Sequence, residues 1–202
     1  MATAADRSQP NVLVTGTPGT GKTCTCAQIA ERAGLRHVNV TELVAERGLH
    51  RGRDEEWDSL IFDEDKVCDE MEDMMSAGGC VVDFHTCDFF PERWFDLVLV
   101  LRADNTVLYD RLQKRGYAAK KITENVECEI MQVILQDARE GYAEQIVHEL
   151  QSDTVEQLEA NAERVVQWAD QWRRDKAAGG GSGGGGGGPG GDGGGAGATA
   201  SD

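Results

Sequence analysis

Residues 16–23 read Gly-Thr-Pro-Gly-Thr-Gly-Lys-Thr, the complete G-x-x-x-x-G-K-[ST] spacing of a phosphate-binding loop (P-loop). The loop follows the β-branched run 11–15 and precedes residues 24–33, which have helical character, as the motif requires. Gly16, Gly19 and Gly21 let backbone N–H groups turn inward around an oxyanion, and the helix start adds the positive end of its dipole. Lys22 supplies a mobile charge for the β- and γ-phosphates, and Thr23 a hydroxyl for Mg²⁺. The stretch therefore predicts a nucleoside triphosphate site after the first strand.

Length and composition predict one folded domain followed by a tail. The chain has 202 residues, which is enough for a single hydrophobic core. Fifteen of its 25 glycines lie within 179–197. We therefore expect a flexible leader over 1–10, the domain over 11–176 and a Gly-rich disordered tail over 177–202. The formal charge of −16 argues against strong direct binding of nucleic acid, and it suits either solubility or a basic partner.

The six cysteines are typical of a reducing compartment. They contain no C-x-x-C pair, which argues against a zinc site and against thioredoxin-like chemistry. Cys68, Cys80 and Cys128 fall in expected core segments, where a thiol acts as a small apolar group. The sequence shows neither a secretory leader nor an apolar run of membrane length, so we expect an intracellular protein without a membrane role.

Strand and helix signals alternate along the chain. Leu97 to Leu101 is continuously apolar, as in a central parallel strand covered on both faces. Val67, Met71 and Met75 have the spacing of one helical face. The expected strands are 12–14, 37–40, 80–83, 97–101 and 146–150. The expected helices are 22–32, 42–47 capped by Thr41, 63–77, 105–115, a long helix capped by Thr123, and a last helix behind a capping box of Thr154 and Gln157. Segments 49–62 and 115–122 are expected to be irregular.

This alternation predicts an α/β fold in which a parallel sheet has helices on both faces. Ligands of such sheets bind at the carboxyl ends of the strands. The P-loop follows the first strand and Asp83 ends the third, so both are expected at that edge.

Two residues at this edge are candidates for chemistry. Asp83 ends an apolar strand, where a carboxylate either holds Mg²⁺ or its water, or caps a turn. His85 is placed to orient water or a hydroxyl group, or to hydrogen-bond Asp83.

Three further side chains each allow two interpretations. Arg115 is placed to close over a transferring phosphoryl group or to meet the dipole of its own helix. Arg93 is placed to bind an acceptor phosphate or to form a structural ion pair. Trp57, within an acidic patch, is placed to stack on an acceptor base or to pack inside the fold.

These features favour a compact kinase that closes a basic lid over two nucleotides. The chain lacks the N-K-x-D motif with which GTP switches read their base, and it is too small for a motor ATPase. Closure would exclude water, which otherwise competes for the γ-phosphoryl group.

Several segments also carry a resemblance, and the most specific of them is Asp88-Phe-Phe-Pro-Glu-Arg-Trp94. The others are 12–23, 82–85, 100–102, 108–112, 115–117 and 127–130. Together they resemble the adenylate kinase isoenzyme 6 family, to which a nuclear, coilin-interacting adenylate kinase and a yeast ribosome assembly factor belong. The resemblance covers residues 10–173.

The resemblance implies a P-loop NTPase fold of the adenylate kinase type: a five-stranded parallel sheet, a short acceptor-binding segment at 39–62 and a short lid at 114–124. It implies phosphorylation of AMP, and of dAMP and CMP as related acceptors, by ATP with Mg²⁺, together with ATPase activity. It also implies a role in small ribosomal subunit maturation and 18S rRNA 3′-end processing. The implied partners are a basic small-subunit ribosomal protein and the pre-40S particle, in the nucleus and cytoplasm.

The family's site residues carry over to matching positions here. The implied ATP-binding residues are Gly19, Thr20, Gly21, Lys22, Thr23, Cys24 and Arg115. The implied catalytic residues are Lys22, Asp83, His85 and Arg115, and the implied Mg²⁺ ligands are Thr23 and Asp83.

Three positions depart from the family pattern. Cys24 stands where the family usually has threonine, Thr86 where it often has glycine, and Ala45 where a basic residue is common. The last departure leaves Arg47 and Arg93 as candidates for the acceptor phosphate. Two functions stay open: a nucleoside monophosphate kinase, and an assembly ATPase whose nucleotide state releases a basic ribosomal protein.

Overall fold

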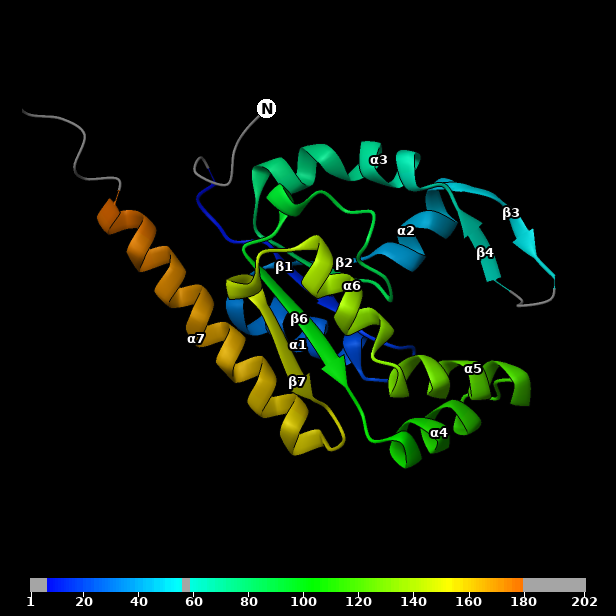
Figure 1. Ribbon diagram of the computed structural model, residues 1–202. Helices are drawn as coiled ribbons and strands as arrows, with labels where there is room; N and C mark the ends of the chain where they lie inside the picture. The colour runs from blue at the N-terminus through cyan, green and yellow to red at the C-terminus, as the bar shows by residue number, and fades with distance from the viewer. Residues whose placement is uncertain (1–6, 56–58, 180–202) are drawn as a thin grey trace, which may run out of the picture.

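The computed structural model describes residues 7–55 and 59–179, so Trp57 and residues 180–202 lie outside the described part. Its central sheet has five parallel strands in the order β2-β5-β1-β6-β7 (Figure 1). The strands are β1 Val12–Thr15, β2 Arg36–Asn39, β5 Cys80–Asp83, β6 Leu97–Arg102 and β7 Val147–Gln151. The predicted five-stranded parallel sheet is confirmed.

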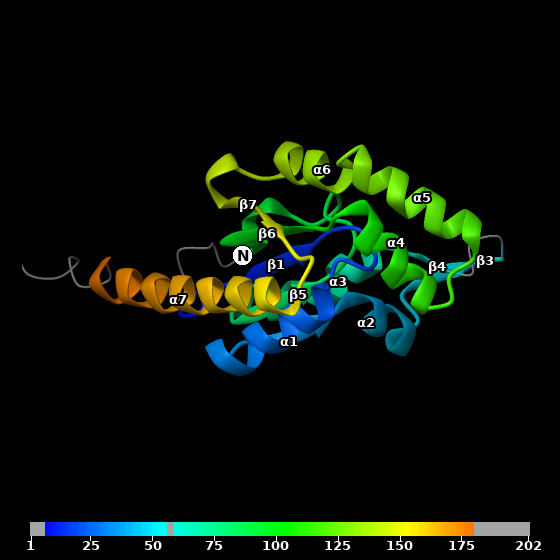
Figure 2. The same cartoon turned by 90° about the horizontal axis from the view of Figure 1, so that it is seen from below.

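Helices cover both faces of the sheet because its strands are apolar on both. Figure 2 shows α1 (Lys22–Ala33) and α7 (Val155–Gly179) on one side and α6 (Val133–Gly141) on the other. Val12 and Val14 pack with α1 and α7, whereas Leu13 packs with α6, α2 (Val40–Arg47) and α3 (Glu64–Ala77). Successive side chains of a strand point to opposite faces, so both layers are anchored on β1.

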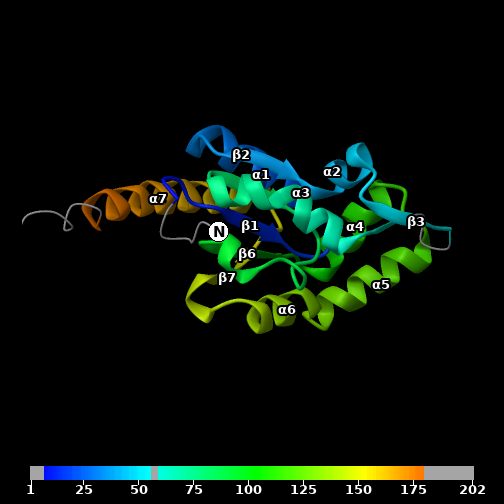
Figure 3. The ribbon, with the colours of Figure 1, turned by 90° about the horizontal axis from the view of Figure 1, so that it is seen from above.

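The segment 49–62, expected to be irregular, contains an antiparallel pair of strands. These are β3 (His50–Asp54) and β4 (Ser59–Phe62). The pair lies at the same end of the molecule as α4 (Asn105–Lys114) and α5 (Ala119–Ile130), away from the C-terminal end of α7 (Figure 3). Since the P-loop faces this end, the hairpin and the two helices flank it.

Several expected boundaries are wrong. Helix α2 begins at Val40, and its cap is Asn39, whose side chain accepts from the backbone N–H of Glu42. The long helix expected after Thr123 is two helices, because Gln132 has a φ of 57° and interrupts it. Helix α5 already begins at Ala119, so only residues 115–118 of the expected irregular segment 115–122 are non-helical.

Some burial predictions also fail. Cys68 and Cys128 are half-buried, whereas Cys26 and Cys87 are buried. Part of the expected leader is packed, since buried Arg7 pairs with Asp96 at 3.0 Å.

Other expectations hold. Cys80 is buried as expected, and the capping box is confirmed: Thr154 Oγ1 accepts from Gln157 N at 3.2 Å, and Gln157 Oε1 accepts from Thr154 N at 3.4 Å. No helix within residues 7–55 and 59–179 has the length and apolar character needed to span a bilayer.

Candidate functional site

The P-loop connects β1 to α1 at the carboxyl edge of the sheet, as predicted. Gly16 and Gly19 have φ values of 138° and 101°, a region that other residues rarely adopt. A Cβ atom on Gly19 would also lie 2.8 Å from Leu108 of α4. Glycine is therefore required here both by the backbone conformation and by the close approach of α4.

Lys22 lies in the first turn of α1 and is almost fully buried. Its Nζ donates to the carbonyl oxygens of Gly16 at 2.7 Å and Thr17 at 3.1 Å. Burial lowers the pKa of Lys22 to about 8, and the Asp83 carboxylate opposes this shift. The ammonium group is thus held inside the loop, where it can exchange carbonyl contacts for phosphate oxygens.

Thr23 and Asp83 meet beneath the loop, as the sequence predicts for a pair of metal ligands. The Thr23 hydroxyl donates to Asp83 Oδ2 at 2.6 Å, and the Asp83 side chain is 5% exposed. Both are hard oxygen ligands beside a phosphate site, which is the donor set that Mg²⁺ takes together with several waters. The residues therefore fit a magnesium ion.

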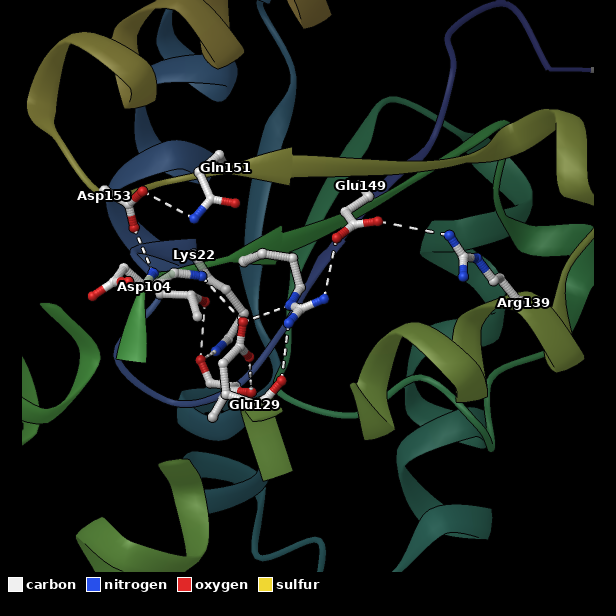
Figure 4. A network of polar contacts seen from close by, with 11 residues as sticks. Lys22, Asp104, Glu129, Arg139, Glu149, Gln151 and Asp153 are labelled. Carbon is white, nitrogen blue, oxygen red and sulfur yellow. Dashed lines mark hydrogen bonds and ion pairs between the residues drawn. The ribbon is translucent and has the colours of Figure 1, made fainter. Parts of the chain in front are cut away.

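A buried carboxylate that the sequence did not single out supports the P-loop from α5. Glu129 is 2% exposed, and it accepts from Thr17 Oγ1 at 2.5 Å, Arg102 Nε at 2.5 Å and Ala103 N at 3.1 Å (Figure 4). Arg102 also donates to Glu149 at 3.1 Å. This network ties α5 and the end of β6 to the loop.

Arg111 supports the P-loop from α4. Its guanidinium donates to the carbonyl oxygens of Gly19 at 3.3 Å, Ser152 at 2.8 Å and Asp153 at 2.7 Å. Because three carbonyl oxygens of two distant segments share one planar cation, α4, the P-loop and the start of α7 are held together. Arg111 is the second supporting residue that the sequence did not single out.

A cavity of about 550 Å³ opens above the P-loop. Five of the predicted site residues with reactive or polar side chains line it: Lys22, Thr23, Cys24, His85 and Arg115. Gly19 and Gly21 line it as well, whereas Thr20 is buried and donates to the carbonyl oxygen of Thr17. Further lining residues include Thr41 of α2, Ser59 of β4, Tyr117 of the loop between α4 and α5, and Lys121 of α5.

His85 lines this cavity, with its ring centroid 4.4 Å from that of Phe84. Burial, and then the charges of Lys22 and Lys121, lower the pKa of His85 to about 4. The imidazole is therefore neutral at pH 7. It can accept or donate a hydrogen bond, but it brings no positive charge to a phosphate.

A second cavity, of about 420 Å³, adjoins the first. The two share Thr41, Ser59 and His85. Among the described residues, the second cavity has one cation, Arg53, and largely apolar walls formed by Val44, Leu60, Phe62 and Phe84. It is therefore suited to a flat apolar group that carries a negative charge.

The two arginines expected at the acceptor phosphate line neither cavity. Arg93 donates to Glu72 at 2.7 Å, and Arg47 pairs with Glu70 at 3.6 Å, so both are engaged by α3. Arg93 thus forms the structural ion pair that the sequence left open as one alternative. The arginine that lines the second cavity is Arg53, which the sequence did not single out.

Comparisons with known proteins agree with this architecture. A family model described as an AAA domain matches residues 12–132. An adenylate kinase isoenzyme 6 homologue of Dictyostelium discoideum is 54% identical over 166 residues, which are 82% of this chain and 95% of that protein. The chain belongs to the adenylate kinase isoenzyme 6 family. Homologues from Caenorhabditis elegans and Saccharomyces cerevisiae are 50% and 46% identical, over 87% and 83% of this chain and 97% and 86% of their own lengths.

Two solved structures share this fold. Shikimate kinase from Bacteroides thetaiotaomicron has a TM-score of 0.55 at 14% identity, and it covers 80% of this chain and 99% of its own. Shikimate kinase from Acinetobacter baumannii has a TM-score of 0.54 at 16% identity, over 81% and 94%. The predicted P-loop kinase fold is thus confirmed.

Proposed function

We propose that this protein is a nucleoside monophosphate kinase that transfers the γ-phosphoryl group of ATP to AMP. The observation that carries the proposal is the pair of adjoining cavities. One contains the P-loop, the other contains apolar walls and Arg53, and they meet at His85. A donor triphosphate in the first and an acceptor monophosphate in the second would bring γ-phosphate and acceptor oxygen together, as in-line transfer requires.

Charge neutralisation would come from the walls of the first cavity. P-loop N–H groups and the Lys22 ammonium would bind the β- and γ-phosphates, and Arg115 would meet the charge of the transferring group. Mg²⁺, held by Thr23 and Asp83, would supply further positive charge to the triphosphate. Because His85 is neutral, its role would be to orient the acceptor oxygen or a water molecule.

The second cavity suits the acceptor for three reasons. Phe62 and Phe84 form an edge-to-face pair in its wall, with ring centroids 5.3 Å apart, and supply aromatic surface for a base. Arg53 can bind an α-phosphate through two parallel hydrogen bonds. Thr41 and Ser59 offer hydroxyl groups where the two cavities meet.

The test is ADP formation from Mg·ATP in the presence of AMP, dAMP, CMP or UMP, compared with ATP alone. We expect AMP to raise the rate well above the ATP-only rate, with dAMP and CMP next. Lys22→Ala should abolish the reaction because phosphate binding is lost. A folded wild-type protein whose ADP formation does not respond to any monophosphate would exclude phosphoryl transfer.

We also propose that the chain hydrolyses ATP and acts in small ribosomal subunit maturation, in the nucleus and cytoplasm, through a basic ribosomal protein. The net charge of −16 and the placement of His85 beside the P-loop cavity support this proposal. A pull-down of that class of protein with ATP, ADP or no nucleotide tests it. We expect retention to depend on the nucleotide, and His85→Gly to reduce release more than ATP binding. Equal retention in all three states would argue against a switch.

A further inference from the structure

Three metal-ligating side chains converge between α1 and the sheet, behind the P-loop. They are Cys26 of α1, His37 of β2 and Asp83 at the end of β5, and their ligand atoms all lie within 4.8 Å of one another. Within residues 7–55 and 59–179 they form the one group of three or more such side chains at this spacing. The absence of a C-x-x-C pair excludes only zinc ligands that are close in sequence, whereas these three residues come from separate elements.

The protein's own contacts leave the His37 and Cys26 ligand atoms largely available, whereas Asp83 Oδ2 accepts the Thr23 hydroxyl. Among the described residues, the buried Nε2 atom of His37 forms no hydrogen bond. Its distance of 3.7 Å from Asp83 Oδ2 exceeds a hydrogen bond. Cys26 Sγ is buried, and its hydrogen bond is a weak one to the carbonyl oxygen of Val82 at 3.9 Å. A buried imidazole nitrogen without a hydrogen bond next to a carboxylate is costly unless something else occupies the space between them.

The separation of the atoms suits a tetrahedral ion. Metal–ligand bonds of about 2.0 Å to nitrogen and oxygen and about 2.3 Å to sulfur place tetrahedral ligand atoms roughly 3.3 to 3.6 Å apart. The distance of 3.7 Å between His37 Nε2 and Asp83 Oδ2 is already close to this value, and Cys26 Sγ lies within 4.8 Å of both atoms. One thiolate and one carboxylate also neutralise a divalent charge.

We propose that Cys26, His37 and Asp83 form a site for a borderline-soft divalent cation of the zinc class, with the fourth position open to water. On binding, the Cys26 thiol proton leaves to solvent as the sulfur–metal bond forms. Sulfur and imidazole ligands select this class of ion over Mg²⁺, which prefers oxygen ligands. The site is therefore distinct in chemistry from the Thr23–Asp83 pair.

The two sites share Asp83, so zinc binding should affect magnesium–nucleotide binding. Asp83 Oδ2 accepts the Thr23 hydroxyl at 2.6 Å, and the same carboxylate would be the oxygen ligand of the zinc ion. Zinc would then withdraw Asp83 from a magnesium–nucleotide complex. Zinc and Mg·ATP are expected to bind antagonistically, whatever reaction the nucleotide undergoes.

The test uses cobalt(II) as a spectroscopic substitute for zinc in the full-length, nucleotide-free, reduced protein. We expect one equivalent of cobalt to give a thiolate-to-metal charge-transfer absorption, and zinc to displace it. Cys26→Ser should remove this absorption, and His37→Asn should shift its titration to higher cobalt concentration. Each variant should also lower zinc affinity roughly tenfold or more. Cys68→Ser and His148→Asn are matched controls outside the cluster and should retain both.

Circular dichroism and thermal unfolding show whether each variant is folded. His37→Asn is the safer of the two, because the His37 side chain is 25% exposed whereas Cys26 is fully buried. The inference is overturned if the folded wild type gives no thiolate–cobalt absorption, or if folded His37→Asn binds cobalt as the wild type does. Addition of Mg·ATP should weaken cobalt binding, and unchanged binding would refute the shared use of Asp83.

Discussion

Replacing Glu129 with alanine should destabilise the protein and weaken nucleotide binding together. The substitution removes a carboxylate that is 2% exposed and has three donors: Thr17 Oγ1, Arg102 Nε and Ala103 N. Arg102, 13% exposed in its side chain, would keep its bond to the carbonyl oxygen of residue 129. Its remaining carboxylate partner would be Glu149, which is 42% exposed.

The expected cost follows from the loss of one member of a buried ion pair. Breaking such a pair from one side costs about 3 to 5 kcal/mol, since the remaining charge stays desolvated. Domains are stable by about 5 to 15 kcal/mol, so the variant should lose a large share of its stability. For a domain of this size, about 2 to 4 °C of Tm accompany each kcal/mol, which gives a fall of roughly 6 to 20 °C.

Urea unfolding followed by far-UV circular dichroism measures the free energy, and calorimetry with Mg·ATP measures binding. Glu127→Ala is the matched control, because Glu127 is exposed on the same helix. Glu129→Gln keeps an acceptor oxygen and should lose less than the alanine variant. A Glu129→Ala protein within about 1 kcal/mol of the wild type would contradict the role of a buried ion pair, because an average point substitution already costs about that much.

Lys22→Arg should remove the alkaline limit of ATP binding. The wild-type Kd for Mg·ATP is expected to rise about tenfold per pH unit above pH 8, because Lys22, with a pKa of about 8, loses its proton. Arginine stays charged over this range, so the Kd of the variant should stay constant. Calorimetry from pH 7 to 9.5 measures both. Arg53→Ala should raise the KM for AMP roughly tenfold without changing the KM for ATP, whereas Arg93→Ala should change neither, as initial rates will show. His85→Asn should reduce the loss of folding stability at acidic pH. The pKa of His85 is about 4 in the folded protein and 6.5 in the unfolded chain, so unfolding takes up a proton between these pH values. The free energy of unfolding of the wild type should therefore fall by up to about 2 kcal/mol from pH 7 to 5, whereas urea unfolding of the variant should show no such loss.

The parts of the fold that could be predicted are those with a signal in consecutive residues of the sequence. Three glycines and a lysine indicate the P-loop. A run of apolar residues that must be covered on both faces indicates β6. Such signals need no knowledge of distant segments. These local signals predict that Lys22, Thr23 and Asp83 lie together, as the structure shows.

The missed elements have weak local signals. His50–Asp54 has no apolar residue, yet it forms β3, because pairing with Leu60 and Ile61 of β4 supplies the apolar side chains. The break between α5 and α6 falls at Gln132, which has a φ of 57°. No glycine or proline at this position indicates the break in the sequence. The conformation of β3 is therefore set by its pairing with β4 rather than by propensity.

The two groups that hold the P-loop in place show why the site itself was only partly predictable. Thr17 meets Glu129 across 112 residues of sequence, and Gly19 meets Arg111 across 92. Considered alone, a glutamate or an arginine within an amphipathic helix is most simply interpreted as solvated. Each becomes essential once the sheet brings α4 and α5 over the loop, because the loop's buried hydroxyl and carbonyl groups then lack water and need charged partners. The phosphate motif therefore predicts where a nucleotide binds, while the residues that keep the motif in shape follow from satisfying buried polar groups in three dimensions.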